Sequence, residues 1–305
     1  MIWLTVDDYG SGGWTAASDA VGRARDYCSD LENGAILIFS APPFALPRAD
    51  LDFLTKLRPA ESRLHKHISY RPGQDLLRGF HGDGNEPRVR DVMRRYAAET
   101  RSFVASFLTP YAGKLQLDYT SFRAFEEEGR SLPVHKKNAL LHVDAFPSRP
   151  TRGARILRVF TNIHPVKERV WEVADRFPEL AAQFVKQAGS GGFTGRSGVA
   201  RSLKRGLSVM GLPVRERTPY DEFMLRFHDW LKENTAFQTA SEGKERRQFP
   251  PLATWLVFTD GLPHAVVSGQ SAMEQTFLIP IEALVAPEAA PIRVLERIAG
   301  RALSY

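Results

Sequence analysis

Apolar residues recur at helical spacing in the first third of the chain and at strand spacing in much of the rest. Positions three and four residues apart share one face of a helix, whereas alternate positions share one face of a strand. The helical spacing predicts helices over residues 14–31, 47–57 and 87–108. The last of these has the clearest ends, because a proline stands at its start and a proline and a glycine follow it.

The strand pattern is concentrated in the middle of the chain and near its carboxyl end. An Asp260-Gly261 turn separates two of these segments and predicts a hairpin. Helices followed by strands with short turns indicate an α+β fold, in which a double-stranded β-helix (a jelly-roll or cupin-like barrel) carries flanking helices. The predicted strands are 35–39, 115–125, 138–143, 155–162, 254–258, 262–267 and 273–279.

The 305 residues are predicted to form a single domain, since a chain of this length can enclose one core with additions. Helical and glycine-rich sequence interrupts the strand pattern and predicts an insertion in the barrel. The expected parts are a helical amino-terminal part (1–113), the barrel core (114–165 and 252–280), a helical, basic insertion (166–251) and a carboxyl-terminal helix (281–305).

Composition narrows the class of protein. An apolar content of 43% and a charged content of 25% are those of an ordinary soluble globular protein. No apolar run approaches the roughly 18 residues that a membrane-spanning helix needs, and acidic residues near the amino terminus argue against a secretory signal. Cys28 is the single cysteine, so no intrachain disulfide can form and a reducing compartment is favoured.

The net charge of +6 suggests an anionic partner, such as nucleic acid, a phosphorylated substrate or an acidic membrane face. Basic residues cluster between Arg196 and Arg217, where they accompany aliphatic side chains at helical spacing. Such a segment fits a helix that lies on an anionic membrane surface. It equally fits a solvated helix that packs its apolar stripe on the barrel. The alternative for the charge excess is an even spread that serves solubility alone.

The most specific chemical pattern is His142-Val143-Asp144, at the end of an apolar run. Residues i and i+2 of a strand share a face, so both side chains can reach one metal ion. His264 follows a hydrophobic strand and the Asp-Gly turn, and is the best third ligand. Two imidazoles and one carboxylate that leave other positions of the metal open are the ligand set of non-haem Fe(II) oxygenases.

Other histidines compete for the third position. His164 lies just past a predicted strand and fits a pocket residue, whereas His228 lies within a helix between aromatic residues and fits the core. His65 and His67 share a strand face, but the basic residues around them suit an anion better than a divalent cation. An isolated His-x-Asp also occurs by chance, so the metal interpretation depends on all three ligands.

Iron held in this way would take 2-oxoglutarate as a bidentate co-substrate before dioxygen. The far carboxylate of 2-oxoglutarate then needs a cationic anchor inside the barrel, best supplied by arginine. Arg158 and Arg123, on strands after and before the metal pair, are the candidates, with Arg155 next. Alternation places Arg155 and Arg158 on opposite faces, and Arg158 is favoured as the inward one. The alternative for each is an exposed strand arginine.

Four segments resemble the core motifs of the Fe(II)/2-oxoglutarate oxygenases: 141–144, 155–165, 264–270 and 274–277. Within that superfamily the chain resembles the bacterial Kdo hydroxylases, which act on the 3-deoxy-D-manno-oct-2-ulosonic acid (Kdo) sugar attached to lipid A. The core motifs cover about residues 115–280. The resemblance implies that His142, Asp144 and His264 are the iron ligands and the catalytic residues.

The chain departs from the superfamily pattern at one point. Many members carry an arginine a short distance beyond the distal histidine to grip 2-oxoglutarate, whereas this chain has Glu274, Gln275 and Thr276 there. The anchor must then come from Arg158 or Arg123, with Gln275 or Thr276 as a neutral helper.

The resemblance implies an enzyme that uses Fe(II), 2-oxoglutarate and dioxygen to hydroxylate the Kdo of Kdo–lipid A to Ko, its 2-octulosonic acid analogue, with release of succinate and carbon dioxide. Its expected place is the cytoplasmic face of the inner membrane, bound peripherally through residues 196–217 or 42–57. The oligomeric state is left open.

Two alternatives to this function remain. One is an Fe(II)/2-oxoglutarate oxygenase of another small molecule or of alkylated nucleic acid, and the other is a non-catalytic cupin-like sugar-binding module. A nucleic-acid enzyme would favour aromatic residues among the basic ones. Residues 196–217 contain none, so no nucleic-acid partner is expected.

Overall fold

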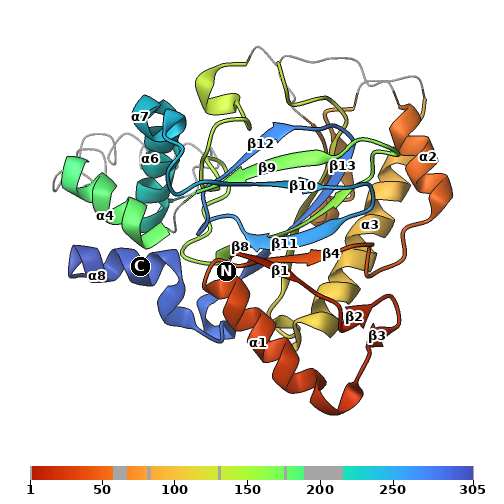
Figure 1. Cartoon of the computed structure of the whole chain (residues 1–305), viewed down its shortest axis with the longest axis horizontal. Coiled ribbons are helices and arrows are strands. Elements are labelled where there is room, and N and C mark those ends of the chain that lie inside the picture. The colour runs from red at the N-terminus through yellow and green to blue at the C-terminus, as the bar shows by residue number, and fades with distance from the viewer. Residues whose placement is uncertain are drawn as a thin grey trace, which may run out of the picture.

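The structure is a computed structural model that describes residues 2–57, 67–80, 84–129, 132–174, 177–188 and 216–304. A large and a small β-sheet face each other, and helices pack outside them (Figure 1). The predicted α+β class is confirmed, and the strands predicted for the jelly-roll-like barrel, apart from residues 138–143, contribute to these two sheets.

The large sheet has eight strands within the described ranges. Neighbouring strands are antiparallel except for the parallel pair β1–β4 at one edge. In order across the sheet they are β1 (Trp3–Thr5), β4 (Ile36–Phe39), β11 (Thr254–Phe258), β8 (Arg155–Asn162), β13 (Ala272–Ile279), β7 (Gln116–Arg123), β5 (Ile68–Arg71) and β6 (Leu76–Arg78).

The small sheet is antiparallel, in the order β10 (Glu245–Phe249), β9 (Arg169–Val173) and β12 (His264–Ser268). Aromatic rings fill part of the space between the two sheets. The ring centroid of Trp171 on β9 lies 4.7 Å from that of Phe160 on β8 and 5.4 Å from that of Trp255 on β11. These contacts fix the separation of the sheets beside the metal site described below.

Alternation along β8 gives the large sheet one face that packs in the hydrophobic core and one face that points toward the small sheet. Leu157 and Val159 belong to the hydrophobic core that includes residues of α3. Arg158 and Phe160 point the other way, toward the small sheet. The polar chemistry of this strand therefore lies between the sheets.

The long helix α3 (Glu86–Phe107) packs on the outer face of the large sheet (Figure 1). Val92, Tyr96, Phe103 and Phe107 recur on its buried side, and each buried side chain of this kind stabilises the fold by about 1.5–3 kcal/mol. The remaining elements are the helices α1 (Ala20–Glu32), α2 (Arg48–Lys56), α4 (Phe177–Ala188), α6 (Pro219–Glu233), α7 (Thr235–Thr239) and α8 (Pro291–Ala299), with a small hairpin of β2 (Tyr9–Gly10) and β3 (Gly13–Trp14).

A second hydrophobic core joins α4, α6 and α8 beside the sheets. A capping box between Thr218 and Asp221 starts α6. Oδ1 of Asp221 also accepts hydrogen bonds from the backbone nitrogens of Thr151 and Arg152, at 2.9 and 3.1 Å. One carboxylate thereby ties the chain after the predicted metal pair to the start of α6.

The parts expected from the sequence have other bounds in the structure. The expected helical insertion, 166–251, includes the strands β9 and β10 of the small sheet, so its described helices span only 177–239. The expected helical part, 1–113, likewise supplies β1, β4, β5 and β6. β9 escaped prediction because it is short and begins with Arg169, which hides the alternation of its buried residues.

Two local predictions were wrong. Residues 138–143 form no strand and make one isolated bridge, between His142 and His264. The Asp260-Gly261 turn closes no hairpin, because β11 lies in the large sheet and β12 in the small one. The turn instead carries the chain from one sheet to the other.

Within the described ranges, no helix is both long enough and apolar enough to cross a membrane. Residues 196–215, which form most of the basic segment on which the membrane expectation depends, lie outside the described residues.

Candidate metal centre

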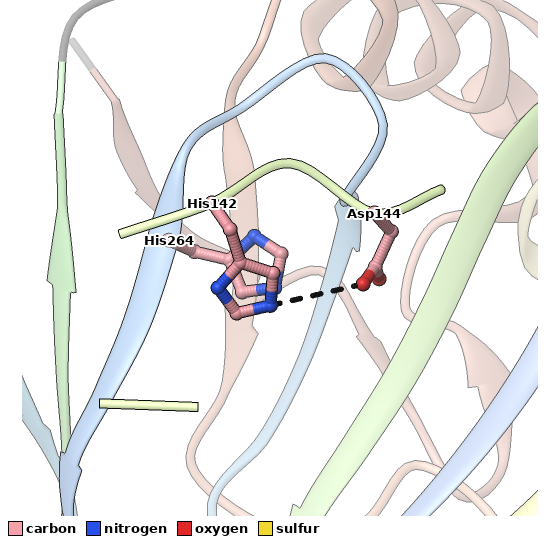
Figure 2. Close-up of side chains that lie close together, drawn as sticks. All are labelled: His142, Asp144 and His264. Atoms are coloured by element: carbon pink, nitrogen blue, oxygen red, sulfur yellow. Dashed lines mark ion pairs between the residues drawn. The ribbon is translucent and has the colours of Figure 1, made fainter. Parts of the chain in front are cut away.

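The three predicted ligands meet beside β12 (Figure 2). His264 begins β12, and His142 and Asp144 lie on the extended segment next to it. One ligand atom from each residue can be chosen so that all three lie within 4.8 Å of one another, and Nε2 of His142 is 3.9 Å from Oδ1 of Asp144. Small side-chain rotations would bring the three donors onto one ion.

Backbone hydrogen bonds fix both segments that carry the ligands. The backbone nitrogen of His142 donates to the oxygen of His264 at 3.1 Å, and the reverse bond is 3.0 Å. The backbone nitrogen of Asp144 donates to the oxygen of Thr259 at 2.8 Å. Because directly paired residues present their side chains on the same face, the two imidazole centroids lie 4.8 Å apart.

A nearby carbonyl orients each imidazole. Nδ1 of His142 lies 2.7 Å from the oxygen of Leu140, and Nδ1 of His264 lies 3.0 Å from the oxygen of Leu262. An Nδ1–H that donates to a carbonyl leaves the lone pair on Nε2, which is then free to face a metal. Trp171 stacks on His264, with centroids 5.1 Å apart and planes 17° apart, and so holds the ring plane.

The protonation states suit a divalent cation. Burial lowers the pKa of His142 and of His264, so both imidazoles are neutral at neutral pH. Burial alone would raise the pKa of Asp144, but the positive charge of Arg158 is the largest of the effects that outweigh burial and hold that pKa at about 2. Two neutral imidazoles and an ionised carboxylate can bind a metal without first losing protons.

Arg158 holds the second oxygen of Asp144. Its Nε lies 2.8 Å from Oδ2 of Asp144, as an ion pair that lacks hydrogen-bond geometry, and its Nη1 pairs with Glu274. Arg123 reaches Glu274 from β7, with Nε 2.8 Å from Oε2. Burial would raise the pKa of Glu274, but Arg123 and Arg158 outweigh it and lower that pKa. Both arginines predicted as co-substrate anchors thus lie inside the protein and share a buried carboxylate.

A third arginine in the interior was not found from the sequence. Arg169 on β9 is fully buried and uses Nη1 to donate to the backbone oxygen of Gly269 at 3.0 Å. Its Nε and Nη2 are buried and have no hydrogen-bond partner among the described residues. Burial, and then the charge of Arg123, lower the pKa of Arg169 to about 10. Alternation along β9 puts Arg169 on the same face as Trp171, the residue stacked on His264.

Thr276 and Gln275, the predicted neutral helpers, lie on opposite faces of β13. Thr276 shares the interior face with Glu274 and pairs with Arg158 in the strand register. Gln275 faces the other side, where Oε1 accepts from Thr120 at 2.6 Å and Nε2 donates to backbone carbonyls. The structure therefore gives no support to Gln275 as a ligand of the co-substrate, because strand alternation turns it away from the metal centre.

Arg155 also faces away from the metal centre. Its Nε lies 2.9 Å from Oδ2 of Asp260, and its guanidinium carbon lies 4.2 Å from the ring centroid of Phe258. Of Arg155 and Arg158 on β8, only Arg158 lies on the metal side.

The remaining histidines lie at different distances from the triad. His228 on α6 was expected in the core, but its ring centroid is 5.1 Å from that of His142 and its Nδ1 is 2.6 Å from the oxygen of Val143. Nδ1 of His164 accepts from the backbone of the exposed segment that follows it, at 2.7 Å from the nitrogen of Lys167. His65 lies outside the described residues.

Two imidazoles and one carboxylate, convergent from two segments beside facing β-sheets, are the ligand set that defines the 2-His-1-carboxylate class of iron oxygenases. A family model for 3-deoxy-D-manno-oct-2-ulosonic acid (Kdo) hydroxylases matches residues 14–302. The chain therefore belongs to the Kdo hydroxylase family.

Solved structures of the Kdo hydroxylase KdoO, a non-heme Fe(II) α-ketoglutarate-dependent dioxygenase, are similar to the chain at 32% identity, with 100% of this chain and 98% of that chain covered. The TM-score is 0.85 for its complex with α-ketoglutarate and Fe(III), 0.85 for its complex with cobalt(II), and 0.86 for its apo structure. A search of curated proteins found no match.

Proposed function

We propose that the chain is an Fe(II)- and 2-oxoglutarate-dependent dioxygenase that hydroxylates Kdo. The observation that carries this proposal is the convergence of His142, Asp144 and His264 in a chain of the Kdo hydroxylase family. A relative with 32% identity has been solved with both Fe(III) and α-ketoglutarate. A non-catalytic module would not need these three side chains to converge.

The residues present fit Fe(II). The Nε2 atoms of His142 and His264 are oriented by their Nδ1 contacts, and Asp144 is held ionised by Arg158. Because Arg158 occupies one oxygen of Asp144, the carboxylate would offer the metal its other oxygen and leave further coordination positions open. Fe(II) and 2-oxoglutarate supply dioxygen activation when bound, and the protein supplies position and exclusion of water.

Arg169 fits the far carboxylate of 2-oxoglutarate. Its Nε and Nη2 are buried and have no partner in the part of the chain that the structure describes, and a carboxylate would accept from both and compensate a cation that burial and Arg123 disfavour. Arg158 and Arg123 line the same interior, with their charges partly balanced by Glu274. The anchor would then be on β9, which accounts for the absence of an arginine at positions 274–276 of β13.

We further infer that the Kdo is carried by lipid A and that the protein binds the membrane surface from the cytoplasmic side. The net charge of +6 and the composition of residues 196–217 support this inference. Liposome co-sedimentation tests it, with binding expected to vesicles that contain anionic lipid and weaker binding to neutral ones. Equal binding to both, or none, would contradict it.

The function itself is tested on the natural product. Lipopolysaccharide from cells that contain the protein should carry one additional oxygen atom on Kdo, and that from otherwise identical cells with the His142→Ala variant should not. Mass spectrometry of the released inner core makes the comparison. An identical core in both strains would contradict the assignment of Kdo as substrate.

A further inference from the structure

Tyr119 on β7, Arg71 on β5 and Arg149 form an aromatic and basic cluster that lies level with the metal centre in the strand register. A β-bulge places Asp118 and Tyr119 of β7 together opposite Thr276 of β13. Thr276 pairs in turn with Arg158 of β8, which contacts Asp144. Tyr119 is thus two strands from Arg158, about 10 Å across the sheet.

Two guanidinium groups converge on the ring of Tyr119. The Cζ atom of Arg149 lies 3.8 Å from the ring centroid, and that of Arg71 on β5 lies 5.0 Å from it. The same atom of Arg149 lies 4.2 Å from the ring centroid of Phe146, two residues beyond Asp144. Contacts with ring faces fix these guanidinium groups and leave N–H edges for a ligand.

The cluster is only partly neutralised. Nη1 of Arg149 pairs with Asp118. Arg71 has no ion pair with any described residue, and its Nε is a buried atom without a hydrogen-bond partner among them. A buried donor of this kind is costly unless a ligand or water accepts from it. Among the described residues, the two arginines with Asp118 therefore leave one positive charge uncompensated.

A cavity of about 510 Å³ lies beside the segment that follows Arg149, and its volume is in the range of small-molecule sites. It is lined by Leu278, the next interior residue after Thr276 on β13, and by Pro150 and Arg152 of the segment that follows Arg149. That segment is fixed in place, because Asp221 accepts from its backbone at Thr151 and Arg152, and Arg217 donates to the oxygen of Pro147.

We propose that Arg71 and Arg149, held on the ring of Tyr119, bind an anionic group of the substrate, a carboxylate or a phosphate, and so position the sugar at the metal centre. This proposal rests on the proposed function, because that function makes the substrate an acidic sugar. The ordinary structural role of Arg149 would be to fasten its segment to β7 through Asp118, but such a role does not explain the buried Nε of Arg71, which has no partner among the described residues.

The test measures steady-state hydroxylation of Kdo–lipid A by the Arg71→Gln, Arg149→Gln and Arg71→Lys variants. Loss of one charge-assisted hydrogen bond predicts a KM for Kdo–lipid A that rises roughly tenfold or more, with kcat less affected. Arg71→Lys keeps the charge and should recover part of the loss. Arg246→Gln, at an exposed ion pair on β10, is the matched control and should keep the KM of the unchanged protein.

Two further measurements separate this proposal from other causes. Binding of 2-oxoglutarate to the cobalt(II)-loaded variants, followed by calorimetry, should match the unchanged protein, and so should the unfolding midpoint of Arg71→Gln. Dephosphorylated Kdo–lipid A distinguishes the two ligand sources. If the glutamine variants still show a raised KM with this substrate, the group bound is a carboxylate. If their KM equals that of the unchanged protein, the group bound is a phosphate.

Unchanged KM values in both glutamine variants would overturn the proposal, and so would equal losses of 2-oxoglutarate binding. If the unchanged protein gives no hydroxylated product from either substrate, the proposed function fails and this proposal fails with it. If the unchanged protein forms the hydroxylated product and the variants have a normal KM, the proposed function stands and only the arginine site is overturned.

Discussion

His142 and His264, from distant parts of the chain, exchange a pair of backbone hydrogen bonds, at 3.1 and 3.0 Å. This bridge brings their imidazole centroids to 4.8 Å, and carbonyls of Leu140 and Leu262 set the orientation of each ring. The main chain itself therefore assembles two of the three ligands. We expect the centre to be largely formed before a metal binds.

Removing any one ligand should abolish tight metal binding without unfolding the protein. His142→Ala, Asp144→Ala and His264→Ala are each expected to weaken cobalt(II) binding more than about 100-fold, because each leaves two donors. Calorimetric titration with cobalt(II) makes the measurement. His164→Ala is the control, since Nδ1 of His164 contacts its own exposed loop. Binding by a ligand variant that matched this control would contradict the assignment of that residue.

Arg169→Gln should weaken 2-oxoglutarate binding and leave the metal in place. The change removes the charge and donors that a carboxylate would use, and the expected loss of affinity is roughly 10- to 100-fold. Titration of 2-oxoglutarate into cobalt(II)-loaded protein measures it. Arg246→Gln alters an exposed ion pair with Glu172 in the same sheet and serves as the control. A normal affinity of Arg169→Gln for 2-oxoglutarate would indicate that Arg158 or Arg123 is the anchor instead.

Breaking the buried pair of Arg155 and Asp260 should reduce stability and spare metal binding. Burial raises the pKa of Asp260, and the charge of Arg155 opposes this rise because it stabilises the ionised carboxylate. Arg155→Met removes the partner of this buried carboxylate. The expected loss is about 3–5 kcal/mol of unfolding free energy, against at most about 1 kcal/mol for the exposed Arg246→Met. Urea denaturation measures both. A smaller loss for Arg155→Met than for Arg246→Met would contradict the structural role of this pair.

The metal-free protein should lose stability in mild acid. Burial lowers the pKa of His264 and of His142 in the folded state, whereas both regain a pKa of about 6.5 when unfolded. Between the lowered value and about 6.5 the unfolded chain binds more protons, so the unfolding free energy falls as pH falls through that window. Urea denaturation with a chelator present, at about pH 7.5 and about pH 5.5, measures the slope. His264→Gln should show a shallower slope, and an equal or steeper one would contradict this origin.

The sequence revealed those parts of the fold whose pattern is local. β8 and β11 match their predicted bounds, because each is a buried apolar segment between clear turns. β9 was missed, since Arg169 at its start resembles a loop residue until the opposite strands are known. The supposed hairpin at Asp260-Gly261 failed because a turn signal does not say whether the next strand joins the same sheet.

The site was predictable to a similar extent. His142 and Asp144 stood out by their spacing, and the alternation of β8 separated Arg158 from Arg155. Arg169 and His228 could not be found in this way, because both reach the site from elements whose placement depends on tertiary packing. Gln275 was selected by position in the sequence, and the pleat of β13 turned it to the other face.

We expect this metal centre to couple decarboxylation of 2-oxoglutarate to hydroxylation of Kdo. The most direct test is to incubate purified protein with Fe(II), 2-oxoglutarate, dioxygen and Kdo–lipid A. The amount of succinate and the mass of the sugar are then measured in the same reaction. The prediction is one succinate formed for each oxygen atom added to Kdo, with neither product from the His142→Ala variant. Succinate without modified Kdo would contradict the substrate, and hydroxylated Kdo from the variant would contradict the metal centre.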